Sequence, residues 1–320
     1  CLLPDLLLTC EVPSPLRLSG LGGAVCADDR GGGAMNTHAW WLAGAFVVLG
    51  PLAGALLAGI DRRLTARMQS RQGPPILQPV YDVLKLFEKD TLVVTRLQTL
   101  YLWSFLFFMV ISGFILFLGS DLLLSLFALT VSGIFLCLAA YSTNSPYSNI
   151  GSSRELMLMM AYEPMLILVP LGFYLTTDSF RVADIVAGSP WQVLQLSGIL
   201  IGFLFVLTIK LRKSPFDLSS SHHGHQELVK GLTTDFSGSD LALVEIALWF
   251  ENVILFGWLY LFFAPWGPWL ALPIAFALFF VEVLVDNTHA RLTWSSTLKA
   301  TWWVTLLVGV TNLMLLPLVV

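Results

Sequence analysis

The chain of 320 residues is 56% hydrophobic and only 12% charged, with a mean hydropathy of +0.78 and a formal net charge of −4. A soluble domain carries about 25% charged residues, so this composition leaves too little polar surface to coat a globule of this length. It excludes a soluble globular protein and predicts an all-α polytopic membrane protein. The four cysteines form no CxxC pair, so we expect no cysteine-ligated metal centre and no disulfide framework in this chain.

Residues 1–34 differ in composition from the rest of the chain. They hold three of the four cysteines and several prolines, and they end in a run of glycines shortly before Met35. No basic head precedes an apolar core, so the segment is a poor match to a signal peptide. We expect a disordered extension or a wrongly assigned start, with a functional tail as the alternative. Residues 35–320 then form a single membrane domain.

Eight apolar runs after Met35 are long enough to cross a hydrocarbon core of about 30 Å at about 1.5 Å per residue. They predict eight transmembrane helices at residues 38–60, 98–119, 121–141, 155–177, 192–210, 240–264, 267–286 and 298–319. Lys and Arg concentrate in the odd-numbered loops between these helices, whereas the even-numbered loops carry only Arg181. The positive-inside rule therefore predicts cytoplasmic odd-numbered loops and outside ends for the eight-helix body. No internal repeat is visible, which argues against an inverted-repeat transporter.

The first cytoplasmic loop contains a predicted helix of its own. Apolar residues at positions 76, 77, 80, 83, 84 and 87 fall on one helical face, and two prolines precede them at 74 and 75. This pattern indicates a short amphipathic helix on the membrane surface. Two functions remain open for it, a lipid anchor or a lid over an entrance between helices.

Acidic residues inside the predicted membrane helices are candidates for an ion pathway. Inserting an ionised side chain into a membrane helix costs about 2.5–3.5 kcal/mol of free energy. Because of this cost, such a residue is by default interpreted as part of an ion pathway. Glu163 lies about two turns into the fourth predicted helix, and Glu245 and Glu251 lie in the sixth. We predict a proton-path role for all three. The alternative is a buried carboxyl that is hydrogen-bonded between helices.

Two further pairs join these candidates. Glu282 and Asp286 lie four residues apart in the seventh predicted helix and therefore share a face. Asp286 is close enough to the predicted surface for solvation to explain it. Arg154 and Glu155 stand at the predicted start of the fourth helix, where a carboxylate complements the helix dipole. That placement is by itself a sufficient explanation for Glu155.

The polar segment at residues 210–238 separates two apolar runs, and we expect a hydrophilic partner to meet the membrane there. His222, His223 and His225 lie close together in it, but their spacing matches no recognised metal-ligand pattern. Packing against a partner or proton relay at the interface is therefore favoured over metal binding. The chain shows no phosphate-binding loop and no nucleophile–base constellation, so a nucleotide-driven pump and a hydrolase are both unsupported.

Several motifs resemble subunit 1 of respiratory complex I and its counterpart in the bacterial enzyme. They are RMQSRQGP, LQP and DVLKLF between residues 67 and 87, NSPYSNIG at 144–151 with Arg154, Tyr162-Glu163, PFDL at 215–218, ELV at 227–229 and FSG at 236–238. The resemblance covers about residues 40–315. It implies that Arg154, Glu163, Asp217, Glu227 and Asp235 lie near the position of the quinone site of complex I.

One departure narrows the resemblance. Complex I members carry acidic residues after the PFDL-like motif, whereas this chain has SSSHHGHQ at 219–226. Together with SRELM at 153–157, EPM at 163–165 and NTHARL at 287–292, this segment is more similar to energy-converting, membrane-bound nickel–iron hydrogenases of the Ech and formate-hydrogenlyase type. A hydrogenase needs no quinone, so the matching cavity is expected to be narrowed or to serve coupling only.

The hydrogenase resemblance implies a set of partners. They are the large and small hydrogenase subunits, a ferredoxin-like iron–sulfur subunit and an antiporter-like membrane subunit, and the nickel–iron centre and iron–sulfur clusters belong to these partners. This chain would carry no cofactor and would couple their redox reaction to H⁺ or Na⁺ movement in a prokaryotic plasma membrane. We expect the redox arm to dock on its cytoplasmic loops through Arg71, Asp217, His222, His223, His225, Glu227, Lys230 and Asp235.

Two alternatives remain. One is the quinone-site membrane subunit of a complex I-like oxidoreductase, which the missing acidic residues after Leu218 disfavour. The other is a stand-alone ion transporter, which the absence of a repeat and the large charged loops disfavour. No nucleic acid partner is expected.

Overall fold

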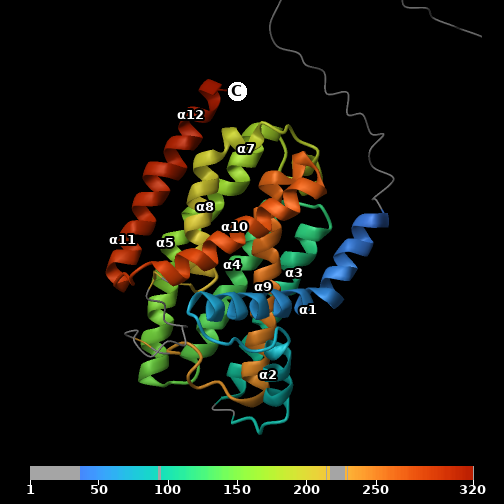
Figure 1. Cartoon of the computed structure of the whole chain (residues 1–320). Coiled ribbons are helices and arrows are strands. Elements are labelled where there is room, and N and C mark those ends of the chain that lie inside the picture. The colour runs from blue at the N-terminus through green and yellow to red at the C-terminus, as the bar shows by residue number, and fades with distance from the viewer. Residues whose placement is uncertain (1–36, 93–94, 214, 217–227, 229, 320) are drawn as a thin grey trace, which may run out of the picture. The chain divides into compact units, whose positions relative to one another are not determined.

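In the hydrocarbon core of a membrane no water can satisfy the backbone, so apolar runs of this length are stable there as helices. The computed structural model describes residues 37–92, 95–213, 215–216, 228 and 230–319. Within these residues the chain is helical, with two isolated bridges and no strand (Figure 1). The predicted all-α fold is confirmed. The expectation for residues 1–34 lies outside the described part.

The long helices are α1 (Thr37–Met68), α3 (Arg96–Phe117), α4 (Leu122–Tyr141), α5 (Pro146–Thr177), α9 (Gly238–Phe263) and α10 (Pro268–Thr288). A last continuous stretch comprises α11 (Trp294–Val304), the π-helical turn η2 (Thr305–Val310) and α12 (Thr311–Val319). The shorter elements are α2 (Gln78–Phe87), α6 (Val182–Val186), α7 (Gln192–Gln195), α8 (Ser197–Lys210) and the 3₁₀ turn η1 (Ala264–Trp266).

Seven helical stretches of the described chain are long and apolar enough to cross a membrane, which makes it a multi-pass membrane protein. The predicted helix at 192–210 is instead divided into α7 and the 14-residue α8. At about 1.5 Å per residue, α8 falls short of a hydrocarbon core of about 30 Å. The predicted count of eight spanning helices is therefore not confirmed.

Helix α5 begins nine residues earlier than predicted, at Pro146. Proline suits the first turn of a helix, because its missing N–H would have no partner there. Glu155 consequently lies in the third turn of α5. The prediction that it stands at a helix start and complements the dipole is wrong, because the dipole effect fades within the first turn.

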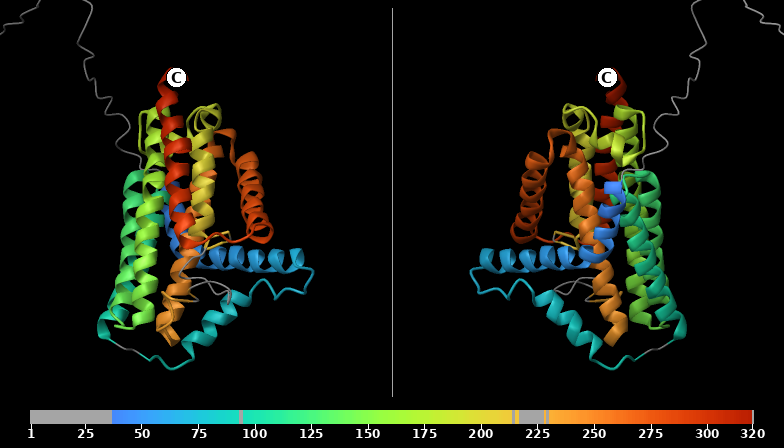
Figure 2. Two further views of the ribbon diagram at one scale, coloured as in Figure 1. Left: turned by 90° about the vertical axis from the view of Figure 1, so that its left-hand side faces the viewer. Right: turned by 90° about the vertical axis from the view of Figure 1, so that its right-hand side faces the viewer.

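Helix α1 is also longer than predicted and carries Arg62, Arg63 and Arg67 on its last turns rather than in a loop. Figure 2 shows it bending so that its second part runs across the other helices. Pro51 lies inside α1, and an interior proline removes a backbone hydrogen bond and kinks a helix. The bend carries the C-terminal part of α1 over α9 toward α2.

Helix α9 lies at the centre of the bundle, with α3, α4, α5 and α8 standing beside it (Figures 1 and 2). Its apolar side chains are spread around the whole helix, as expected for a buried helix. The predicted amphipathic helix is confirmed as α2, which packs Val83 against Ala55, Ala242 and Trp249. Leu77, Tyr81 and Leu84 at this helix remain exposed.

Candidate functional site

A small polar cavity of about 30 Å³ lies among α3, α4, α5, α8 and α9. This volume is enough for a water molecule, which needs about 10–15 Å³ by the same measure. Helix α5 contributes Glu155, Met159 and Tyr162, which are spaced i, i+4 and i+7 and so lie on one helical face. Glu251 of α9 and Lys210 of α8 complete the ionisable lining together with Arg212.

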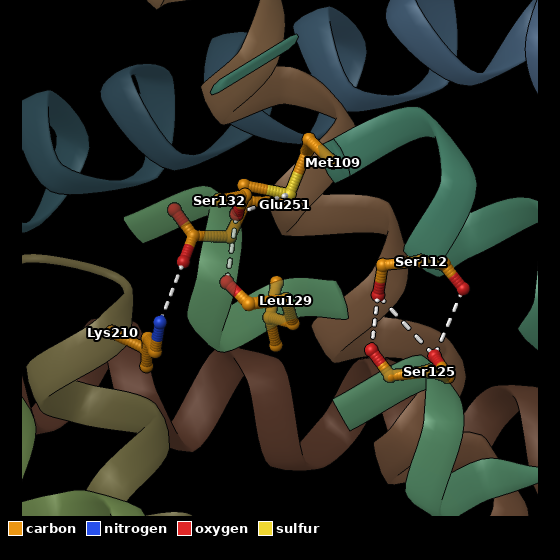
Figure 3. A network of polar contacts seen from close by, with 7 residues as sticks. All are labelled: Met109, Ser112, Ser125, Leu129, Ser132, Lys210 and Glu251. Atoms are coloured by element: carbon orange, nitrogen blue, oxygen red, sulfur yellow. Dashed lines mark hydrogen bonds and ion pairs between the residues drawn. The ribbon is translucent and has the colours of Figure 1, made fainter. Parts of the chain in front are cut away.

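Lys210 and Glu251 form a buried ion pair at this cavity. The Lys210 ammonium donates a hydrogen bond of 3.1 Å to Oε1 of Glu251, and the two side chains are 8% and 10% exposed (Figure 3). The ammonium also lies 5.0 Å from the centroid of the Tyr162 ring, which attracts a cation through its face. The pair is therefore held by α5, α8 and α9 together.

Serine hydroxyls make further polar contacts in α3 and α4. Ser112 of α3 and Ser125 of α4 exchange bonds, each hydroxyl donating to the other residue's carbonyl at 2.7 and 2.9 Å (Figure 3). Ser132 of α4 lines the cavity, and its hydroxyl donates to the carbonyl of Leu129 at 2.7 Å. The Ser112–Ser125 exchange therefore joins α3 to α4, whereas the Ser132–Leu129 bond lies within α4.

A second, larger cavity of about 580 Å³ lies where α1, α2, α9 and α10 meet. Two of its walls are single helix faces with i, i+3, i+4 and i+7 spacing, namely residues 58, 61, 62 and 65 of α1 and residues 79, 82, 83 and 86 of α2. Glu245 of α9 and Asp286 of α10 add acidic groups. Because α2 forms a wall, the interpretation of this helix as part of an entrance gains support over a simple lipid anchor.

Two ion pairs form between side chains that line this larger cavity. Lys213, which is 5% exposed, donates a hydrogen bond of 2.7 Å to Oδ1 of Asp61 and lies 4.9 Å from the Phe279 ring centroid. Nη1 of Arg62 donates to Oδ2 of Asp82 at 3.0 Å, and both of these side chains are more than 40% exposed. The first pair ties α1 to the segment after α8, and the second ties α1 to α2.

Arg212 lines both cavities. It follows the end of α8 with φ of 58°, in the left-handed region. The N–H of Arg212 donates to the carbonyl of Ile209, and the N–H of Lys213 donates to that of Thr208, both at 3.0 Å. This is the Schellman arrangement, in which the left-handed position is usually glycine.

Glu282 of α10 is 4% exposed and lines neither cavity. Its Oε2 is buried and has no hydrogen-bond partner among the described residues. Asp286, one turn further along α10, lies at the larger cavity. The two carboxyls share a helix face as predicted. Glu282 is buried away from both cavities, whereas Asp286 lines the larger one.

Comparison with known proteins assigns the chain to a family. A family model described as NADH dehydrogenase matches residues 42–317. The chain belongs to the NADH dehydrogenase family. The resemblance to subunit 1 of complex I and its bacterial counterpart is thereby confirmed, and the protein is a membrane subunit of the complex I-like and energy-converting hydrogenase group.

Relatives of both kinds are found within the family. The chain is 30% identical to hydrogenase-4 component C of Escherichia coli (strain K12) over 264 residues, which cover 74% of this chain and 83% of that protein. It is 29% identical to formate hydrogenlyase subunit 4 of the same organism over 279 residues, covering 77% and 89% of the two chains. It is also 29% identical to a subunit of the NADH-quinone oxidoreductase of Bacillus cytotoxicus over 312 residues, covering 86% and 91%.

A solved structure supports the fold. The chain aligns with one chain of the membrane-bound sulfane sulfur reductase, an archaeal respiratory membrane complex, with a TM-score of 0.75 and 23% identity. The alignment covers 86% of this chain and 99% of that one. At this identity the likeness concerns the fold alone.

The structure separates the acidic residues predicted for the pathway. Glu245 and Glu251 are six residues apart, so they point to different sides of α9 and line different cavities. Glu163 follows Tyr162 directly, about 100° further round α5, and does not line the small cavity. Neither cavity brings all the predicted carboxyls of this NADH dehydrogenase family member together.

The positions that the resemblance placed near a quinone site are distributed differently. Arg154, Glu163 and Asp235 line neither cavity. Arg154 lies 5.3 Å from the centroid of the Trp294 ring, and Asp235 accepts a hydrogen bond of 3.1 Å from Thr143. The expectation that the matching cavity is narrowed or serves coupling only therefore stays a prediction.

The predicted docking residues fall into two groups. Arg71 lines the larger cavity, and Lys230 is exposed in a left-handed conformation with its carbonyl accepting from the Thr234 hydroxyl. The remaining positions other than Asp235 lie outside the described residues; they are Asp217, His222, His223, His225 and Glu227. No group of three His, Cys, Asp or Glu side chains in the described part could hold a metal, and the three histidines lie outside that part.

The basic side chains that line the two cavities are not predicted from the sequence. Lys210, Arg212 and Lys213 count there among the charges of a cytoplasmic loop, and Asp61 has no predicted role. A signal for Lys210 is available, since it closes the predicted helix at 192–210 and an ionisable residue in such a run marks a pathway. The pairing with Glu251 spans 41 residues and follows only from the packing of α8 on α9.

Proposed function

We propose that this chain is the membrane-anchoring and ion-coupling subunit of an energy-converting nickel–iron hydrogenase complex. It links ferredoxin-dependent proton reduction, or hydrogen oxidation in reverse, to movement of H⁺ or Na⁺. The observation that carries the proposal is the Lys210–Glu251 pair, buried beside a polar cavity inside the bundle. A buried ion pair contributes little net stability, so a role in charge movement explains it better.

The ionisable groups suggest a route for the coupling. Glu245 and Asp286 lie at the larger cavity, and Glu155 and Glu251 lie at the smaller one. Arg212 contacts both spaces, so a charge change at the larger cavity has a short electrostatic path to the buried pair. Glu282 and Glu163 line neither cavity, so they join this route only if side chains move or bound water connects them to it.

The family relationship supports a complex rather than a stand-alone transporter. Relatives in the family are named as components of hydrogenase-4, formate hydrogenlyase and NADH-quinone oxidoreductase, all of them multi-subunit oxidoreductases. We infer that the α2 end faces the cytoplasm of a prokaryote and carries the redox arm. The nickel–iron centre and the iron–sulfur clusters then belong to partner subunits, and an antiporter-like subunit lies alongside in the membrane.

Purification of the intact complex tests this proposal. An affinity tag on this chain should recover hydrogenase large and small subunits and an iron–sulfur subunit, with stoichiometric nickel. The purified complex should evolve hydrogen from reduced ferredoxin. A preparation without nickel that reduces a quinone would refute the hydrogenase assignment while leaving the family intact.

One observation favours a second candidate, the quinone-site membrane subunit of a complex I-like oxidoreductase. The larger cavity has the volume of about 300–1,000 Å³ that is typical of small-molecule sites, and it combines apolar walls with polar groups. A soluble short-chain quinone should then be reduced by the complex. Loss of this reduction in Phe279→Ala would support the quinone site.

A further inference from the structure

The larger cavity is lined by charged side chains of both signs. Its lining includes four basic side chains, Arg62, Arg71, Arg212 and Lys213, and four acidic ones, Asp61, Asp82, Glu245 and Asp286. The formal charges therefore cancel overall. Lys213 pairs with Asp61 and Arg62 pairs with Asp82, and Asp286 takes part in a further interaction.

Three of the remaining groups have no ion-pair partner among the described residues. Arg71 donates from Nε to the side chain of Gln69 at 2.9 Å, and its guanidinium meets no carboxylate. The side chains of Arg212 and Glu245 take part in no hydrogen bond or ion pair within the described part of the chain. A lining of zero net charge that leaves cations and a carboxylate unpaired suits a zwitterionic ligand.

The backbone at Arg212 gives an independent indication. A residue with a Cβ is strained in the left-handed region, and glycine would end α8 there at lower cost. From this position the side chain of Arg212 lines both cavities, which gives the strained backbone a functional explanation. A favourable interaction with the C-terminal dipole of α8 is the structural alternative, and it would not require the side chain to line a cavity.

The surroundings of the cavity favour an amphiphile. Helices α1 and α10, which form two of its walls, are mostly exposed along their apolar lengths. Leu52, Leu56 and Ile60 of α1 and Phe276, Phe280 and Leu284 of α10 present apolar side chains at the surface. A ligand held in the cavity can therefore extend acyl chains along these two helices.

We propose that the larger cavity binds the headgroup of an aminophospholipid, with its phosphate held by Arg71 and Arg212 and its ammonium by Glu245. Guanidinium groups bind phosphate through paired donors, and basic pockets between membrane helices are known to hold lipid headgroups. The cavity volume of about 580 Å³ is sufficient for such a group. This inference goes beyond the proposed function, and it competes with a quinone for the same cavity.

Lipid retention by the intact complex tests this site. The complex is purified in mild detergent, washed, and incubated with dioleoyl phosphatidylethanolamine, and the retained lipid is measured by mass spectrometry. Arg212→Gly should lower the affinity about tenfold to a hundredfold, the loss expected for a charged hydrogen-bonding group. The glycine suits the left-handed backbone, so the variant should still fold and assemble. Arg63→Gln is the matched control, since Arg63 is exposed on α1 and does not line the cavity.

Four further measurements test the site. Glu245→Gln should abolish a preference for phosphatidylethanolamine over phosphatidylglycerol, because only the former carries an ammonium. Unchanged retention in both Arg212→Gly and Arg71→Gln would overturn the lipid site. Displacement of the lipid by millimolar inorganic phosphate would also overturn it, in favour of a free-anion site. A quinone that co-purifies in place of the phospholipid and is lost in Arg212→Gly would likewise contradict it.

Discussion

The ammonium of Lys210 and the carboxylate of Glu251 meet at 3.1 Å inside the membrane domain, joining the end of α8 to the middle of α9. Each charge would be costly alone at this depth, since removing an ion from water costs several kcal/mol. The Tyr162 ring and the small cavity complete their surroundings. The pair links α8 to α9 electrostatically, so a change of charge nearby alters the interaction between these two helices.

Removing one partner of this pair should be more harmful than removing both. Lys210→Met leaves Glu251 buried without a cation and should destabilise the protein by about 3–5 kcal/mol. The double variant Lys210→Met with Glu251→Leu should recover most of this loss, because apolar side chains of similar volume replace a buried pair well. Thermal unfolding of the purified complex compares the variants. Equal stability of the single and double variants would contradict the pairing.

The two ion pairs of α1 should differ in their importance. Asp61→Asn leaves the buried Lys213 without its partner and should cost about 3–5 kcal/mol. Asp82→Asn breaks an exposed pair and should cost about 0–1 kcal/mol. Thermal stability of the purified complex measures both. Losses of similar size would show that the Lys213–Asp61 contact is not the stronger anchor of α1.

Glycines of α1 provide a test of the helix packing. A Cβ added at Gly54 would lie 2.1 Å from the backbone oxygen of Trp249, so Gly54→Ala should push α1 away from α9. A Cβ at Gly44 meets nothing within 4 Å, and Gly44→Ala should be neutral or up to about 1 kcal/mol stabilising through helix propensity. Yield and thermal stability in detergent measure the difference. Normal behaviour of Gly54→Ala would argue against the close α1–α9 contact.

Docking of the redox arm is predicted on the segment around Glu227. Reversing this charge in Glu227→Lys should release the arm from membranes at lower salt than in the unchanged protein, because interactions between exposed charges are screened by salt. Asp184→Lys serves as the control, since Asp184 is exposed in the predicted outer loop. Salt titration of membrane-bound subunits provides the measurement. An arm that stays bound equally at high salt would exclude a docking role for Glu227.

Much of the fold follows from local pattern. Apolar length predicts the positions of α3, α4, α9 and α10 within a few residues, and helical periodicity predicts α2. The break between α7 and α8 is not predictable in this way, because Leu196, where the two short helices meet, is itself a good helix former. The extension of α1 to Met68 is missed because its charged last turns have the composition of a loop.

The candidate site is predictable only in part. Carboxyls in apolar runs, such as Glu251 and Glu282, are visible in the sequence because each is locally unusual. Their partners are not, since Asp61 and Lys213 are 152 residues apart and meet only after α1 bends across the bundle. Helical periodicity does predict that Glu245 and Glu251 point to different sides of their helix. In the structure each of them lines a different cavity.

Ion movement per hydrogen molecule in proteoliposomes addresses the proposed coupling role of the buried pair. The purified complex is reconstituted and supplied with reduced ferredoxin, and hydrogen evolution is recorded together with proton uptake and radioactive sodium uptake. We predict that the unchanged complex and the exposed control Glu88→Gln move ions in a fixed ratio to hydrogen, and that this ratio falls toward zero in Glu251→Gln. An unchanged ratio in Glu251→Gln, or hydrogen evolution without any ion movement in the unchanged complex, would contradict ion coupling by this chain.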